Sequence, residues 1–150
     1  MPKPIYVLNG PNLNLLGKRE PAVYGRESLA DVEKRAHARA KTVGLAIEFR
    51  QSNSEGEIID WIHEAREKGG GIILNAGAYS HTSIAILDAL QASELPVIEV
   101  HLSNIFRREP YRQHSYVSLA AKGVICGLGP KGYELALEAM AETLGAGSGG

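Results

Sequence analysis

The stretch Ile5–Gly25, IYVLNGPNLNLLGKREPAVYG, decides the fold and holds the first candidate functional residues. It begins with Ile5–Leu8, a short apolar and β-branched run that is typical of a buried strand. Four turn-forming residues, Asn9–Asn12, end that strand and begin a polar loop that contains Arg19 and Tyr24. Ligands of open α/β sheets bind at the carboxyl ends of the strands, so this loop predicts a binding crevice.

Beyond this stretch, apolar strand patterns alternate with helix patterns along the chain. Each helix segment shows the spacing of three and four residues that marks one packed face. Buried parallel strands separated by helices predict an α/β fold: a flavodoxin-like, doubly wound, five-stranded parallel sheet with strand order 2-1-3-4-5. The predicted strands are 5–8, 45–49, 71–75, 97–101 and 124–128, and the predicted helices are 28–43, 55–68, 82–93 and 130–144.

Length and composition indicate one domain with a small-molecule ligand. The chain has 150 residues, and we expect residues 1–144 to form a single catalytic domain and the glycine-rich residues 145–150 to form a flexible tail. The formal net charge of −1 gives no reason to expect nucleic acid or a membrane as partner. The single cysteine, Cys126, lies in an apolar run, and neither a membrane span nor a secretory leader is visible. We therefore expect a soluble, cytoplasmic protein.

The predicted helix over residues 82–93 is apolar on nearly every side, with Asp88 as its only charged residue. Such a helix must be covered on more than the face that packs on a sheet. Two interpretations are open. Either residues 102–115 form a loop over the helix, or the helix lies at an interface between subunits, which is the interpretation that we favour.

In the predicted strand order, polar residues from three strands meet at one edge of the sheet. Asn9 and Asn12 follow the first strand, Asn75 ends the third, and Glu99 and His101 end the fourth. Because the carboxyl ends of neighbouring parallel strands lie side by side, we expect these side chains to converge on one crevice. For Asn75 the alternative is a residue that only ends its strand.

Tyr24 is a candidate general base if its phenol is held as a phenolate. An unperturbed tyrosine has a pKa of about 10, and one or two arginines in a water-poor site are able to lower it toward neutrality. Arg19 and Arg112 are the cationic candidates. The alternative is an ordinary surface tyrosine beside a surface arginine.

Glu99 and His101 stand two residues apart on a strand, so both side chains leave it on the same face. The carboxylate then orients the imidazole or holds it protonated, and a protonated histidine at a crevice is a candidate general acid. The alternative is a histidine that is simply satisfied at a strand end, and His81 is likewise consistent with a helix cap. No histidines have the spacing of a metal site, and residues 127–132 have the wrong spacing for a phosphate-binding loop, so we expect no metal ion and no nucleotide at these residues.

Four blocks of the sequence together resemble the type II dehydroquinases, the type II 3-dehydroquinate dehydratases. The blocks are LNGPNLNLLGKREPAVYG at 8–25, QSNSEGEIIDWIHEA at 51–65, LNAGAYSHTSIAILDAL at 74–90 and EVHLSNIFRREPYRQHSYVS at 99–118. The resemblance covers the chain from Ile5 to Leu144. It implies cofactor-free removal of water from 3-dehydroquinate to give 3-dehydroshikimate through an enolate, a step of the shikimate pathway of aromatic amino acid biosynthesis and also of quinate breakdown.

The resemblance also implies roles for the matching residues. Tyr24 corresponds to the phenolate base, Arg19 to the arginine that keeps it charged, and His101 to the acid that protonates the departing hydroxyl. The remaining correspondences are Glu99 as the carboxylate that orients the acid, Asn12 as support for the enolate oxygen through a water, Asn75, His81, Arg112, Leu102 and Ser103 as substrate ligands, and Asp88 as a residue that reaches a neighbouring subunit's site. Family members assemble as dodecamers of four trimers, and the segment 18–25 acts as a lid. The variable residues 106–110 make Arg112 the least direct of these correspondences.

Two other classes share the predicted fold. A flavin- or nucleotide-binding flavodoxin-like protein would carry a loop rich in Ser, Thr or Gly after the first strand. A receiver-type signalling module would carry an acidic pair there and an aspartate at the end of the third strand. The chain has Asn9–Asn12 and Asn75 at these positions instead.

Overall fold

A computed structural model describes residues 3–18, 22 and 26–149 of the chain. In this part of the chain, five strands form one parallel sheet in the order β2-β1-β3-β4-β5, which confirms the predicted fold class and strand order. The strands are β1 (Ile5–Asn9), β2 (Ile47–Gln51), β3 (Gly71–Asn75), β4 (Val97–His101) and β5 (Gly123–Cys126). Asn9 and Asn75 are paired residues of β1 and β3, so these two amides leave the sheet side by side.

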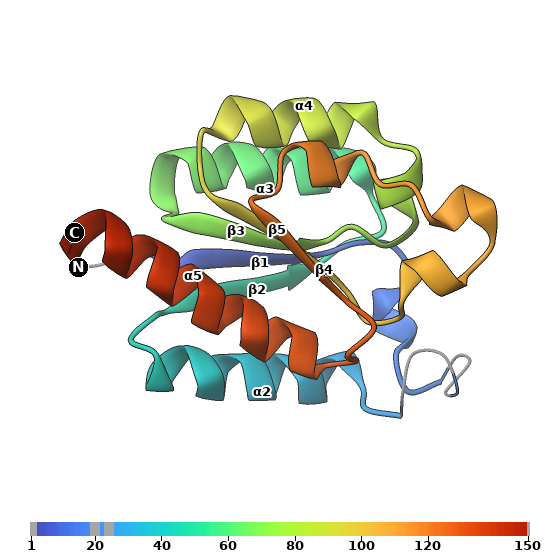
Figure 1. The fold of residues 1–150 in the computed structure, drawn as a ribbon, viewed down its shortest axis with the longest axis horizontal. Coiled ribbons are helices and arrows are strands. Elements are labelled where there is room, and N and C mark those ends of the chain that lie inside the picture. The colour runs from blue at the N-terminus through green and yellow to red at the C-terminus, as the bar shows by residue number, and fades with distance from the viewer. Residues whose placement is uncertain (1–2, 19–21, 23–25, 150) are drawn as a thin grey trace.

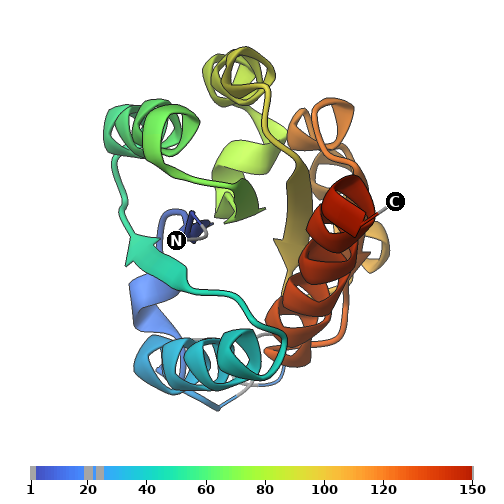
Figure 2. The ribbon, with the colours of Figure 1, turned by 90° about the vertical axis from the view of Figure 1, so that its left-hand side faces the viewer.

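Helices cover both faces of the sheet (Figures 1 and 2). One face carries α2 (Leu29–Thr42) and α5 (Lys131–Gly149), and the other carries α3 (Glu55–Lys68) and α4 (Ile84–Ser93). Successive side chains of a strand point to opposite faces, so β1 contributes to two separate cores. Ile5 and Val7 pack in the core with α2 and α5, whereas Tyr6 and Leu8 pack in the core with α3 and α4. Burial on both faces explains why this strand reads as a continuous apolar run.

Serine side chains define the starts of three helices. The hydroxyl of Ser28 accepts a hydrogen bond from the backbone N–H of Asp31, whose carboxylate accepts one from the backbone N–H of Ser28. This reciprocal pair is a capping box, and it begins α2 close to residue 28, where the predicted helix begins. Ser54 and Ser83 cap α3 and α4 through one bond each. Since Ser83 is the cap of α4, His81 is not required for that purpose.

Three strands differ slightly from their predicted bounds, and the first of them, β1, includes Asn9 as its last residue. β2 begins at Ile47 and not at residue 45, because the N–H of Leu45 donates to the carbonyl of Ala40 at the end of α2. β5 ends at Cys126 and not at residue 128, because Gly127 has a φ of +86° that takes the chain out of the extended conformation.

Helix α5 is longer than predicted. The sequence places its end at residue 144, whereas the helix continues to Gly149. Residues 145–149, which we expected to be a flexible tail, therefore have helical backbone. Glycine lowers helix propensity by only about 1 kcal/mol per residue relative to alanine, and no proline follows to stop the helix.

Helix α4 is covered on two sides by its own chain. It packs on α3 and on the 3-10 turn η5 (Val117–Leu119), so part of the cover comes from residues that follow the 102–115 loop. Ile84 remains 54% exposed, and Asp88 is also exposed. A subunit interface over this remaining surface stays a prediction.

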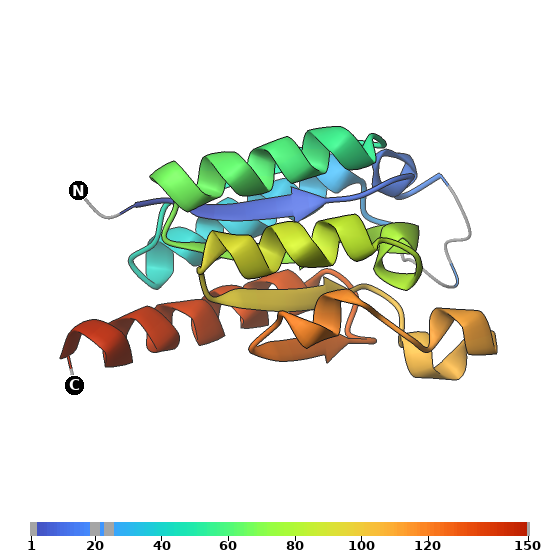
Figure 3. The ribbon, with the colours of Figure 1, turned by 90° about the horizontal axis from the view of Figure 1, so that it is seen from above.

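The carboxyl ends of the strands point to one end of the molecule, where short 3-10 turns gather (Figure 3). These turns are η1 (Leu13–Leu15), η2 (Gly77–His81), η3 (Ile105–Arg107) and η4 (Pro110–Arg112). Across residues 3–18, 22 and 26–149, no helix combines the length and the apolar character that crossing a membrane requires. The turns form the walls of the candidate site.

Candidate active site

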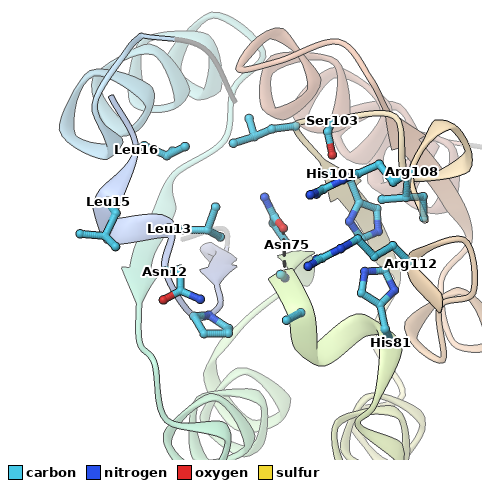
Figure 4. A pocket seen from close by; sticks show the side chains of 15 residues that line it. Asn12, Leu13, Leu15, Leu16, Asn75, His81, His101, Ser103, Arg108 and Arg112 are labelled. Carbon is cyan, nitrogen blue, oxygen red and sulfur yellow. Dashed lines mark hydrogen bonds between the residues drawn. The ribbon is translucent and has the colours of Figure 1, made fainter. Parts of the chain in front are cut away.

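A crevice at the carboxyl ends of β1, β3 and β4 gathers most of the predicted site residues (Figure 4). The turn η1 and the loop before it form one wall, and the segment after β4 forms the opposite wall. The lining residues that the sequence predicted are Asn12, Asn75, His81, His101, Leu102, Ser103 and Arg112. Most of the other lining residues are apolar or small: Pro11, Leu13, Leu15, Leu16, Gly77, Ala78 and Ile105.

The Glu99 carboxylate lies behind His101 and is fully buried. Nε2 of His101 donates a hydrogen bond to Oε2 of Glu99. The hydroxyls of Ser115, at 2.6 Å, and Ser118 donate to Oε2 and Oε1 of the same carboxylate. Burial acts to raise the pKa of Glu99, but the bonds from His101 and the two serines outweigh it and hold the pKa below its usual range. The carboxylate is therefore ionised and orients the imidazole, which leaves Nδ1 as the ring nitrogen available to a ligand.

The second imidazole of the crevice, His81, lies parallel to His101 with the ring centroids 6.4 Å apart. Nδ1 of His81 is 2.7 Å from the carbonyl oxygen of His114. A carbonyl oxygen only accepts, so Nδ1 carries the hydrogen. Burial lowers the pKa of His81, with a smaller contribution in the same direction from the charge on His101, and this favours the neutral ring. Its Nε2 is therefore a hydrogen-bond acceptor, suited to a ligand hydroxyl.

Residues at the end of β2 and in the loop before α3 form hydrogen bonds with the backbone around Asn12. Asn12 has left-handed backbone, with a φ of 70°, a conformation that asparagine adopts more readily than most residues. Its N–H donates to Oδ1 of Asn53 at 3.0 Å. The side chain of Gln51 donates both to that oxygen and to the carbonyl of Gly10, each at 3.1 Å. Residues 51–53 therefore help to fix the backbone that carries Asn12.

Two arginines, Arg108 and Arg112, line the wall opposite Asn12 (Figure 4). Nε of Arg112 donates to the Glu109 carboxylate at 2.6 Å, and its guanidinium lies 5.3 Å from the centroid of the Tyr111 ring. The bond to Glu109 raises the pKa of Arg112 and keeps it cationic. Cations on this wall favour an anionic ligand. Sequence reasoning missed Arg108, although it stands four positions before Arg112 in the same basic segment.

Asn75 forms the floor of the crevice between the two walls (Figure 4). Its Oδ1 accepts from the N–H of Gly77 at 3.2 Å, and its Nδ2 donates to the hydroxyl of Tyr133 at 2.9 Å. Tyr133 comes from α5 and is buried. The apolar spacing of α5 indicates only that Tyr133 belongs to the packed face of the helix, because periodicity does not reveal that a hydroxyl reaches a polar group.

The crevice thus offers a carboxylate–imidazole pair, an imidazole acceptor, two amides and two cations. These groups suit proton transfer to and from a small polar anion. Among the described residues, no group of three or more His, Cys, Asp or Glu is arranged to hold a metal ion.

Comparison with known proteins identifies the family. The sequence profile of the family described as dehydroquinase class II matches residues 3–141 of this chain. The chain belongs to this family. A protein of Chelativorans sp. (strain BNC1) named 3-dehydroquinate dehydratase is 62% identical over 145 residues, covering 96% of this chain and all of that protein. A protein of Pseudomonas putida named 3-dehydroquinate dehydratase 2 is 63% identical over 140 residues, covering 93% and 94% of the two chains.

Solved structures of class II dehydroquinases have the same fold. The type II dehydroquinase from Propionibacterium acnes superposes with a TM-score of 0.90 at 48% identity, covering 95% of this chain and 98% of that one. The type II dehydroquinase from Butyrivibrio crossotus also has a TM-score of 0.90, at 42% identity, covering 93% and 97% of the two chains. The resemblance seen in the sequence blocks is therefore confirmed, and the flavin-binding and receiver alternatives are set aside.

The other predicted site residues of this class II dehydroquinase are Arg19, Tyr24 and Asp88. Arg19 and Tyr24, the candidate arginine and base, lie outside the described residues. Asp88 is on α4, exposed, and does not line the crevice of its own chain. Their roles remain predictions.

Proposed function

We propose that this class II dehydroquinase removes water from 3-dehydroquinate to give 3-dehydroshikimate, without a cofactor and through an enolate. Family membership supports the reaction. The observation that carries it in the chain itself is the buried Glu99–His101 pair at the crevice, because a poor hydroxyl leaving group requires an acid. A base takes the proton from the carbon beside the ketone, and the electron pair forms the enolate. The electrons then return to form a carbon–carbon double bond as the hydroxyl leaves, protonated by the acid, as water.

In this mechanism His101 is the acid, and Glu99 acts through it. The ionised Glu99 accepts the hydrogen bond from Nε2 of His101 and fixes the orientation of the imidazole. Because Nε2 of His101 is bonded to Glu99, the proton for the leaving hydroxyl comes from Nδ1. The hydroxyls of Ser115 and Ser118 keep the carboxylate fixed during the transfer.

The base in this mechanism is Tyr24, and Arg19 keeps its phenolate charged. Both assignments rest on the correspondence with the family. A segment 18–25 that closes as a lid would bring them together over the crevice and expel water, which strengthens the electrostatic interaction between phenolate and guanidinium. Asn12 lines the crevice, and in this proposal it supports the enolate oxygen through a water between them.

The substrate is a carboxylate with several hydroxyls, and the remaining polar groups suit it. Asn75, the neutral His81 and Arg112 supply a donor, an acceptor and a cation for its oxygens. The backbone at Leu102 and Ser103 lines the crevice and binds the substrate carboxylate in this proposal.

The proposed assembly is a homododecamer of four trimers in the cytoplasm. Asp88 supports this assembly. Its carboxylate is exposed on α4 and does not line the crevice of its own chain, so it suits a contact with the site of the next subunit. Size-exclusion chromatography with light scattering tests this part separately. A monomer with full activity would contradict it.

The test of the reaction is the absorbance of the conjugated enone product after 3-dehydroquinate is added to purified, chelator-treated protein. The parent should turn over, and both Tyr24→Phe and His101→Ala should lose at least about a hundredfold in kcat, the scale of a lost acid or base. His37→Ala is the matched control, since His37 is exposed on α2 beside Glu33. A folded parent without turnover would sink the dehydratase proposal.

A further inference from the structure

We propose that Tyr133, on α5, is a positioning residue whose hydroxyl fixes the orientation of the Asn75 amide at the floor of the crevice. The inference rests on the proposed function, and it adds a residue that lies outside all four sequence blocks of the site. Tyr133 itself does not line the crevice. It acts through Asn75, which does.

A continuous chain of hydrogen bonds runs beneath the crevice. At one end, Nδ2 of Asn9 donates to the carbonyl of Arg50 at 3.0 Å. The hydroxyl of Tyr133 donates to Oδ1 of Asn9 at 2.6 Å and accepts from Nδ2 of Asn75 at 2.9 Å. At the other end, Oδ1 of Asn75 accepts from the N–H of Gly77 at 3.2 Å.

This series of hydrogen bonds ends in a backbone group on each side, and each of these groups is either only an acceptor or only a donor. The carbonyl of Arg50 only accepts, so Asn9 turns its NH₂ toward it and its oxygen toward Tyr133. The N–H of Gly77 only donates, so Asn75 turns its oxygen toward it and its NH₂ toward Tyr133. The tyrosine hydroxyl has one hydrogen, which it gives to Asn9, and this leaves it as an acceptor for Asn75. The amide orientations therefore follow from the bonding pattern as a whole.

The consequence for the site is the polarity of its floor. The NH₂ of Asn75 has two hydrogens, and one is bonded to Tyr133. Among the residues that the structure describes, the second hydrogen meets no acceptor, and Asn75 lines the crevice (Figure 4). The floor thus presents a donor to an oxygen of the substrate. A rotated amide would present its own oxygen there and repel that ligand.

Burial makes this arrangement hard to replace. Asn9, Tyr133 and Asn75 are 0%, 1% and 3% exposed, so water does not readily substitute for a missing partner. The Tyr133 ring is also held in place beside Phe49, with the ring centroids 6.1 Å apart. Burial raises the pKa of the Tyr133 phenol, which keeps its hydrogen available for Asn9.

The test is Tyr133→Phe, which keeps the ring and removes the hydroxyl. We expect KM for 3-dehydroquinate to rise about tenfold, the scale of one well-placed hydrogen bond, with a change in kcat below about threefold. A double-mutant cycle with Asn75→Ala separates positioning from general damage. If Tyr133 acts through Asn75, the double variant has the same KM as the single variant Asn75→Ala.

Tyr6→Phe is the matched control. Tyr6 is also buried and its hydroxyl donates to Glu64 at 2.6 Å, but it belongs to the core on the α3 and α4 face. Its loss should lower the free energy of unfolding without changing KM. Should Tyr133→Phe fail to fold, Asn9→Leu removes the acceptor of the tyrosine hydroxyl instead, and a KM rise of about threefold or more is expected, again absent beside Asn75→Ala.

Two results overturn the inference: an unchanged KM in folded Tyr133→Phe, or an equal rise of KM in the Asn75→Ala background. Failure of the proposed function looks different, because it appears in the parent as absent turnover of 3-dehydroquinate. That result also removes the role given to Tyr133 in the reaction.

Discussion

Replacing Ser115 by alanine removes one of the hydrogen bonds that stabilise the Glu99 carboxylate. The Ser115 hydroxyl lies 2.6 Å from Oε2 of Glu99, and Ser115 is only 9% exposed, so water is a poor substitute. A hydrogen bond to a charged group contributes about 1.5–3 kcal/mol, against about 0.5–1.5 kcal/mol for a neutral pair. We therefore expect Ser115→Ala to lower the free energy of unfolding by about 2 kcal/mol at pH 7.

This loss depends on pH, because the bond is strong only while Glu99 is ionised. The fold lowers the pKa of Glu99, since the bonds to its carboxylate outweigh the opposing effect of burial. The stabilisation is therefore complete above the pKa of an unfolded glutamate, about 4.3, and is lost as the pH falls through the lower pKa of the folded state. The difference between parent and variant should shrink below about pH 4.

Urea unfolding at pH 7 and at pH 3.5 to 4, at one fixed protomer concentration, measures both values. Ser93→Ala is the control, because Ser93 is buried and donates at 2.6 Å to the neutral carbonyl of Leu90. Its cost should be about 1 kcal/mol at both pH values. In the proposed mechanism, Ser115→Ala also lowers kcat with little change in KM, since Ser115 does not line the crevice. A deficit for Ser115→Ala that is equal at both pH values would refute the reasoning.

Three further substitutions test other parts of the fold. Glu64 accepts hydrogen bonds from Arg50 at 2.7 Å and Tyr6 at 2.6 Å, and these bonds, led by that of Arg50, lower its pKa to about 2. Glu64→Gln should therefore lower the free energy of unfolding by about 1–2 kcal/mol at pH 7, a value reduced because the Glu64 side chain is 31% exposed. In urea unfolding, the difference between parent and variant should shrink as the pH falls from about 4.5 toward about 2. Gly10→Ala places a Cβ 2.2 Å from the carbonyl oxygen of Ala76, so we expect a loss of about 3 kcal/mol or more in the same assay. Gly56→Ala, inside α3 where no such contact exists, should instead stabilise the protein by about 0.5–1 kcal/mol, and a similar loss at both positions would contradict the steric argument.

The sequence predicted the fold well because its signals are local. The apolar run of β1 and the cap at Ser28 depend on neighbours within a few residues, and the strand order followed from the alternation of strands and helices. The Glu99–His101 pair was also predictable, because two residues on a strand share a face.

The partners of these groups were less predictable, because they come from distant segments. Ser115 and Ser118 meet Glu99 through the course of the loop after β4, which periodicity does not describe. Tyr133 is 58 positions from Asn75 in the sequence, yet its hydroxyl contacts the Asn75 side chain at the floor of the crevice. The apolar spacing of α5 would be the same if that hydroxyl had no partner. The helical end of α5 was missed for another reason: glycine-rich composition favours flexibility without excluding a helix.

The hydrogen bonds that join Tyr133 to the amides of Asn9 and Asn75 also bear on how the protein is synthesised. Synthesis proceeds from the N-terminus, so the strands that carry Asn9, Asn75 and His101 are complete before α5 emerges. Until then, the two amides lack the hydroxyl that joins them. A nascent or truncated chain that ends before residue 133 therefore contains His101 and Glu99 but lacks the hydroxyl that fixes the Asn75 amide. Competence for the reaction arises late, when the last helix docks on the sheet.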